Sequence, residues 1–177
     1  MKSTNGFTLL EILISVGVLA IVSTLIAQVL FTTTRVNKKA EILREVKGNG
    51  EFAIDVFSRL ARNAVAVETV CDIGADSTPA AVFRNADNRR TTIRCWSDGT
   101  AARIASVSAD TVYISGANLT LSASGGSSCA DSSLSFSCPV ESGVVTPMVI
   151  QFSLGTLAEA ENEQVRSSFQ TAVTVRN

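Results

Sequence analysis

Histidine is absent from this chain of 177 residues, and both aromatic side chains and prolines are few. The commonest general base of enzymes and the commonest protein ligand of zinc are therefore missing. Because no nucleophile motif stands out either, the sequence predicts a protein that is not an enzyme and that holds no metal or cofactor. Charged residues make up only 18% of the chain and hydrophobic residues 46%, a composition that excludes a disordered protein.

The few charges are unevenly spread along the chain. Residues 7–67 carry seven basic and five acidic side chains, whereas residues 68–177 carry seven and eleven. The net charges of these two parts are therefore +2 and −4. A general nucleic-acid binder needs a basic surface, so such binding is compatible with this sequence but not indicated by it.

One long apolar run lies near the N-terminus. Residues 12–34 contain no charge, and the apolar core of this run, from Ile12 to Phe31, is 20 residues long and lacks proline. A bilayer core about 30 Å thick needs roughly 20 helical residues, so the run predicts a membrane-spanning helix. Its hydroxyl side chains can return hydrogen bonds to the helix backbone, and they include Ser15, Ser23 and Thr24.

The helical pattern continues beyond the apolar run. Apolar residues recur every three or four positions from Val36 to Ala64, which predicts one helix from about Thr8 to Ala64. The second half of this helix is amphipathic and must pack against something. Glycine is a poor helix former, so we expect a kink or soft turn at Gly48-Asn49-Gly50.

From Val67 onward the pattern changes to short β-type runs separated by turn residues. The expected strands are 79–83, 91–96, 102–107, 111–114, 118–123, 134–138, 144–154 and 165–175. Asp98-Gly99 is a strong hairpin signal between two of them. Thr91, Arg94 and Arg103 could line a groove on these strands, but a solvated hairpin face is the better interpretation.

Four cysteines lie in the β-rich region, at Cys71, Cys95, Cys129 and Cys138. With a membrane segment before them and no Cys-x-x-Cys pair or histidine beside them, they suggest two disulfides and an oxidising compartment. We favour the pairs Cys129–Cys138 and Cys71–Cys95, although the sequence allows all three pairings.

The most specific motif stands at the beginning of the chain. Gly6-Phe7-Thr8-Leu9-Leu10-Glu11 follows a short polar leader that contains Lys2 and precedes the apolar run. This combination resembles the prepilin-type N-terminus of type IV pilins and type II secretion pseudopilins. The signature covers residues 6 to about 31, and the long helix followed by a β-rich region extends the resemblance loosely over the whole chain.

The resemblance implies an α+β, pilin-like fold and a processing site. Gly6 would be the last leader residue, recognised by the prepilin peptidase, and Phe7 would become the new, N-methylated terminus. Glu11 would be the subunit-assembly carboxylate. The expected organisation is a leader (1–6), a transmembrane and assembly helix (7–34), its amphipathic continuation (35–66) and a head built on an antiparallel sheet (67–177).

Glu11 also has a physical argument of its own. An unpaired carboxylate in a membrane helix costs a few kcal/mol or more, so such residues are functional hypotheses by default. A cut after Gly6 creates an α-amine four residues away, and in a staggered bundle Glu11 of one subunit can meet the amine of its neighbour. Such a pair specifies register more than it adds stability. The alternative is a glutamate that snorkels to the membrane edge.

Two simpler interpretations of the N-terminus compete. A cleaved secretory signal would end near Val18-Leu19-Ala20, but Glu11 would lie inside its apolar region. A plain single-pass anchor explains the apolar run but not Glu11. Arg35, Lys38 and Lys39 follow the run, so a positive-inside count places the C-terminal side in the cytoplasm. The resemblance and the cysteines place it outside, and we follow them.

The sequence therefore predicts a minor structural subunit of a type IV pilus, active in initiation or near the tip. Major subunits of the family that it resembles often have a proline in the apolar helix, and this chain has none from Met1 to Thr78, so the resemblance favours a minor subunit. Its partners would be other pilin or pseudopilin subunits, prepilin peptidase, the inner-membrane assembly platform and membrane lipid. It would lie in the inner membrane with its head outside, and then in the filament. A minor pseudopilin of a type II secretion system and a non-polymerising, membrane-anchored periplasmic binding domain are the alternatives.

Overall fold

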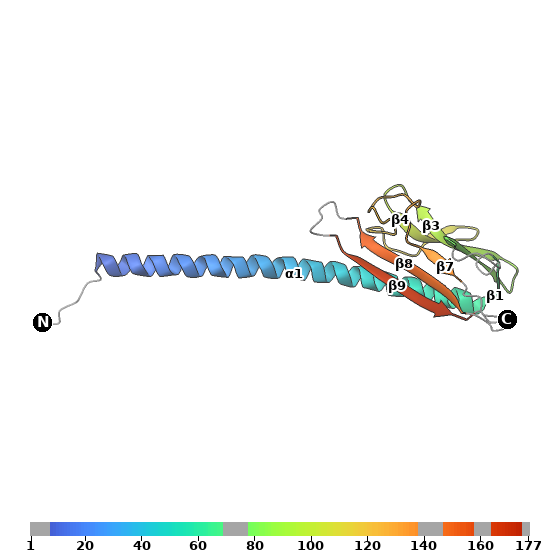
Figure 1. Cartoon of the computed structure of the whole chain (residues 1–177), viewed down its shortest axis with the longest axis horizontal. Coiled ribbons are helices and arrows are strands. Elements are labelled where there is room, and N and C mark those ends of the chain that lie inside the picture. Colours follow the sequence, from blue (N-terminus) through green and yellow to red (C-terminus); the bar gives the residue numbers. More distant parts are fainter. Residues whose placement is uncertain (1–7, 69–77, 138–146, 158–163, 175–177) are drawn as a thin grey trace. The chain divides into compact units, whose positions relative to one another are not determined.

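The computed structural model of the chain describes residues 8–68, 78–137, 147–157 and 164–174. The chain divides into two units, Met1–Glu41 and Ile42–Asn177. Helix α1 (Leu9–Asn63) begins in the first unit and ends in the second. Within the described residues nine strands follow it in the second unit, and the α+β class is as the sequence predicts (Figure 1).

Helix α1 is 55 residues long and matches the predicted span closely. The helix continues through Gly48-Asn49-Gly50, so the soft turn that the sequence predicted as one of two possibilities there is absent. Tertiary packing overrides the weak local propensity, because the ring of Phe169 lies where a side chain at position 50 would be. The helix ends at Asn63, and strand β1 (Ala64–Val67) follows without a loop, where the sequence predicts helix to residue 66.

The amphipathic part of α1 buries one stripe of its surface. The buried residues of this stripe are Val46, Gly50, Ala53, Phe57 and Ala61. Phe57 packs its ring against Phe83 at 5.7 Å and against Phe136 at 5.8 Å, measured between ring centroids. These contacts join the helix to strands from both sheets, so the predicted amphipathic helix does bury its apolar face in the head.

The first sheet has five antiparallel strands in the order β1-β2-β3-β4-β5. After β1 come β2 (Ala80–Asn85), β3 (Arg90–Ser97), β4 (Ala102–Val107) and β5 (Thr111–Tyr113). Each strand pairs with the one before it in sequence, so this sheet is a meander. The predicted hairpin at Asp98-Gly99 joins β3 to β4, and Gly99 has a φ of +94°, which favours glycine.

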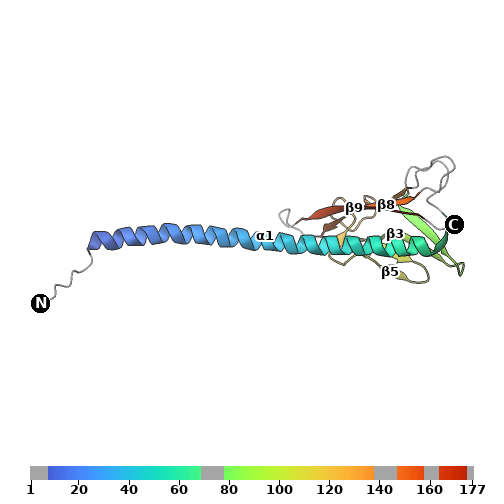
Figure 2. The same cartoon turned by 90° about the horizontal axis from the view of Figure 1, so that it is seen from below.

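The second sheet is built around β8 (Met148–Thr156). The short strands β6 (Leu119–Thr120) and β7 (Ser135–Ser137) pair with it, and so does β9 (Arg166–Val173), over eight residue pairs. Figures 1 and 2 show β9 alongside the part of α1 that belongs to the second unit. The ring of Phe169 lies between Gly50 of α1 and Phe152 of β8, whose ring it stacks on at 5.2 Å.

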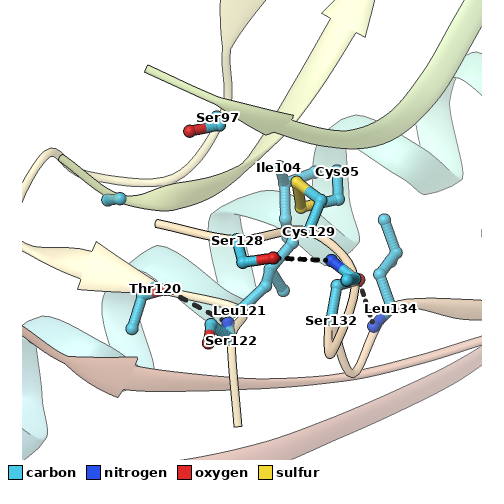
Figure 3. Close-up of a disulfide and its surroundings, with 12 residues drawn as sticks. Cys95, Ser97, Ile104, Thr120, Leu121, Ser122, Ser128, Cys129, Ser132 and Leu134 are labelled. Atoms are coloured by element: carbon cyan, nitrogen blue, oxygen red, sulfur yellow. Dashed lines mark hydrogen bonds between the residues drawn. A yellow bond between two sulfur atoms is a disulfide. The ribbon is translucent and has the colours of Figure 1, made fainter. Parts of the chain in front are cut away.

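The disulfide that the structure describes joins Cys95 to Cys129. Neither favoured pairing of the sequence analysis contains this bond, so both are wrong, because each would need one of these two cysteines. Cys71 and Cys138 lie outside the described residues. Figure 3 shows the bond between β3 and the segment 121–134, which joins β6 to β7, near Ile104 and Leu121. Spatial proximity across 34 residues of chain, rather than sequence spacing, selects the pair.

Candidate functional site

The N-terminus of α1 begins with a capped turn. Thr8 precedes the first helical residue, and its side-chain Oγ1 accepts a hydrogen bond of 3.3 Å from the backbone N–H of Glu11. The backbone oxygen of Thr8 accepts a second bond from the same N–H, at 3.1 Å. A threonine with a glutamate three residues later is a helix-start pattern, so the motif Thr8-Leu9-Leu10-Glu11 sets where the helix begins. Gly6 and Phe7 lie outside the described residues.

Glu11 occupies the first turn of this helix, where the helix dipole favours a negative charge. Its side chain is exposed, and among the described residues it forms neither an ion pair nor a hydrogen bond. The local helix thus explains why a carboxylate is tolerated there. The Glu11 carboxylate nevertheless has no partner within the described part of its own chain.

The surface around and beyond Glu11 is apolar and uncovered. Every large hydrophobic residue from Leu9 to Phe31 is exposed, and each residue is at least 47% accessible. The first half of α1 is long and apolar enough to cross a membrane. Such a surface is stable only in lipid or against other apolar helices.

The hydroxyl side chains of this run bond back to their own helix. Ser15 donates to the carbonyl of Glu11 at 2.8 Å, and Ser23 donates to that of Leu19 at 2.7 Å. Thr24 donates to the carbonyl of Ile21 at 2.7 Å. The expected satisfaction of these hydroxyls is confirmed, and it lowers the cost of placing them in lipid.

In the head, the structure separates the three residues that could have lined one groove. Thr91 points inward and is buried, whereas Arg94 and Arg103 lie on the opposite face of the first sheet. The guanidinium of Arg94 lies 4.3 Å from the ring centroid of Trp96, and that of Arg103 lies 4.2 Å from Tyr113. Strand alternation decides this separation, because odd and even positions of one strand face opposite sides.

Asp98 organises the hairpin between β3 and β4. Its carboxylate accepts hydrogen bonds from the Thr100 hydroxyl at 2.7 Å and from the backbone N–H groups of Ala101 and Thr100 at 2.8 and 2.9 Å. These bonds, led by that of the Thr100 side chain, hold the pKa of Asp98 well below its usual range. Arg103 adds an ion pair at 3.2 Å. This carboxylate therefore serves the fold of the turn.

Sequence reasoning missed what Asn49 does. Its side-chain oxygen accepts a hydrogen bond of 2.9 Å from the backbone N–H of Gly116, 67 residues later, and its amide donates to the carbonyl of Glu45. Asn49 thus ties α1 to the loop between β5 and β6. In the sequence Asn49 is marked only by its position between two glycines. That pattern is typical of a helix break and does not indicate a tertiary contact.

Comparison with known proteins identifies the N-terminal segment. Residues 1–27 match the family model described as the prokaryotic N-terminal methylation motif. No curated protein and no solved structure matches the chain. Among the described residues no cluster of side chains could hold a metal ion.

Proposed function

We propose, on the premise that this chain carries the N-terminal methylation motif of type IV pilins and pseudopilins, that it is a minor structural subunit of a type IV pilus. The motif supports processing by prepilin peptidase. The observation that carries the proposal is Glu11, an exposed carboxylate in the first turn of α1, whose first half is otherwise apolar and uncovered. The chain is a substrate of an enzyme and not itself an enzyme.

In this proposal the cut between Gly6 and Phe7 creates the partner that Glu11 lacks. The new α-amine of Phe7 is a cation, and a neighbouring helix shifted along the filament axis brings that amine to Glu11. Removing one partner of an ion pair in an apolar surrounding costs about 3–5 kcal/mol of stability, because the other charge is left without a partner. The pair therefore selects one stagger of the helices among many that apolar packing alone would allow.

The rest of the chain supports the proposal by its organisation. The uncovered first half of α1 suits a membrane before assembly and a helix bundle after it. The head is cross-linked by the Cys95–Cys129 disulfide, which fits an oxidising compartment outside the cytoplasm. The partners in this scheme are other pilin-type subunits, prepilin peptidase, the assembly platform and membrane lipid.

The mass and the N-terminal sequence of the protein extracted from membranes test the proposal. A chain that begins at methylated Phe7, and that co-purifies with pili, is the expected result. A chain that begins at Met1 in cells with active prepilin peptidase, or near Ile21, contradicts the filament subunit and leaves a plain anchor or a secreted domain. Co-purification with a secretion pseudopilus would replace the pilus by the pseudopilin alternative.

A further inference from the structure

Three cations follow the apolar run of α1 directly. After residues 12–34, which contain no charge, come Arg35, Lys38 and Lys39. Their spacing of three and four positions places them on one side of the helix, which is unbroken here. All three residues are exposed. They form a small basic surface, which we call the basic patch.

The charges of the basic patch are not neutralised by the chain itself. None of the ion pairs within the described residues involves Arg35, Lys38 or Lys39. The nearest carboxylate along the chain is that of Glu41, three positions after Lys38. With Glu41 counted, residues 35–41 hold three basic and one acidic side chain, a net of +2.

The length of the apolar run sets the depth of the basic patch in a bilayer. Residues 12–34 span about 34 Å as a helix, slightly more than a hydrocarbon core of about 30 Å. Arg35 therefore reaches the headgroup layer, and Lys38 and Lys39 lie about 4–6 Å further along the helix. This layer is about 5–7 Å thick on each side, so all three cations lie at headgroup level.

The orientation in the proposed function places these cations outside the cytoplasm. The positive-inside bias disfavours Lys and Arg on that side, close to the end of a membrane segment. A leaflet that contains anionic lipid attracts such cations. Phosphate oxygens also accept charge-assisted hydrogen bonds from Lys and Arg. Anionic headgroups thus offset the cost that the orientation imposes on the basic patch.

We propose that the basic patch binds the phosphates of anionic phospholipids in the leaflet where the apolar run ends. Such a lipid fits both parts of this segment, because its acyl chains cover the exposed apolar side chains and its phosphate meets the cations. The contact fixes the depth of the helix and so keeps Glu11 near the opposite membrane surface. This inference rests on the proposed function, which places α1 in a membrane before assembly, and it adds the lipid class and the residues that bind it.

A lipid titration of the purified full-length chain tests this inference. The chain is kept in a neutral detergent, and native mass spectrometry counts the bound phosphatidylglycerol. Phosphatidylcholine with the same acyl chains is the zwitterionic comparison. We expect phosphatidylglycerol to bind about tenfold or more tightly than phosphatidylcholine, and high salt to reduce this preference.

Two charge-matched double variants locate the binding. Lys38→Gln with Lys39→Gln should weaken phosphatidylglycerol binding by about tenfold or more and leave phosphatidylcholine binding unchanged. The control, Arg44→Gln with Lys47→Gln, removes the same charge from exposed positions of α1 that lie nine and twelve residues after Arg35. Because electrostatic attraction to a headgroup layer falls off within about 10 Å, this control should change the affinity by less than about twofold.

Four results would overturn the lipid proposal. Equal affinities for the two lipids would show no charge preference, and an unchanged affinity of the lysine variant would show that the basic patch does not bind. An equal loss in both variants would make net charge responsible. Displacement of the lipid by an equal concentration of glycerol phosphate would indicate a site for free phosphate.

The N-terminal mass separates this failure from failure of the proposed function. A chain that begins at methylated Phe7 but does not prefer phosphatidylglycerol contradicts the lipid proposal alone. A chain that prefers phosphatidylglycerol but begins at Met1 in cells with active prepilin peptidase contradicts the filament subunit and leaves the lipid contact.

Discussion

Glu11 is the residue whose side chain bears most directly on the proposed function. We predict that Glu11→Leu is still inserted, cut and methylated, because the apolar run and Gly6 are unchanged. Its incorporation into filaments should fall by about tenfold or more, because the α-amine of the neighbour loses its partner in an apolar surrounding. Quantitative immunoblotting measures the amount of the variant in sheared filaments relative to its amount in membranes.

Gln28→Leu is the matched control for this substitution, since it also removes a polar side chain from the first half of α1 and leaves Glu11 in place. Normal incorporation of Glu11→Leu would show that no such ion pair sets the register. The carboxylate would then serve only the first turn of α1.

The carboxylate of Asp98 makes the stability of the head depend on pH. Its folded-state pKa lies below the unfolded value, so its contribution is fully present above the unfolded pKa of about 4. It is lost as the pH falls toward the folded-state pKa. We predict that Asp98→Asn lowers the free energy of unfolding at pH 7 by about 2 kcal/mol.

Acid titrations followed by circular dichroism measure this effect. The difference in stability between Asp98→Asn and the unchanged protein should shrink as the pH falls below about 4. Asp110→Asn is the control, because Asp110 lies in a neighbouring turn and its side chain has no hydrogen-bond or ion-pair partner among the described residues. A difference that stays constant with pH would contradict a role for the charge of Asp98.

Within the helix, two glycines of one segment have opposite roles. A Cβ at position 50 would lie 2.1–2.5 Å from three ring atoms of Phe169, whereas one at position 48 meets nothing within 4 Å. We predict that Gly50→Ala destabilises the head by about 1–3 kcal/mol through overpacking. Gly48→Ala, its matched control, should stabilise the protein by up to about 1 kcal/mol through helix propensity.

Urea unfolding of the two variants, followed in the same detergent, measures both values. A stabilising Gly50→Ala would mean that Phe169 moves aside easily, and that helix propensity decides at this position too. The comparison therefore separates tertiary packing from local preference within three residues of one helix.

At the scale of the whole head, the Cys95–Cys129 bond closes a loop between cysteines that are 34 positions apart in sequence. A loop of this length predicts about 3–4 kcal/mol of stabilisation through the unfolded state. We expect the double variant Cys95→Ala and Cys129→Ala to lose about this much and to become protease-sensitive at lower urea concentrations. Peptide mapping without reduction checks the pairing itself. A fragment that joins Cys71 to Cys95 would contradict the structure.

Most elements of the molecule could be predicted from local patterns. The three-to-four spacing of apolar residues predicted α1 almost to its last residue, and short β-type runs separated by turn residues predicted the strands from β2 to β9 within a few residues. Strand β1 was missed, because Ala64–Val67 continues the helical pattern without a turn signal. The soft turn considered at Gly48-Asn49-Gly50 is absent, because contacts with Phe169 and Gly116 hold these residues in the helix.

The sequence by itself determined the N-terminal motif, the apolar helix and the α+β class, because each depends on residues that are neighbours along the chain. Only the tertiary structure decided that Cys95 pairs with Cys129, that Gly50 accommodates Phe169, and that Arg94 and Trp96 share a face with Tyr113. These contacts join residues far apart in sequence. Strand register and sheet order bring them together, and no local pattern encodes that register.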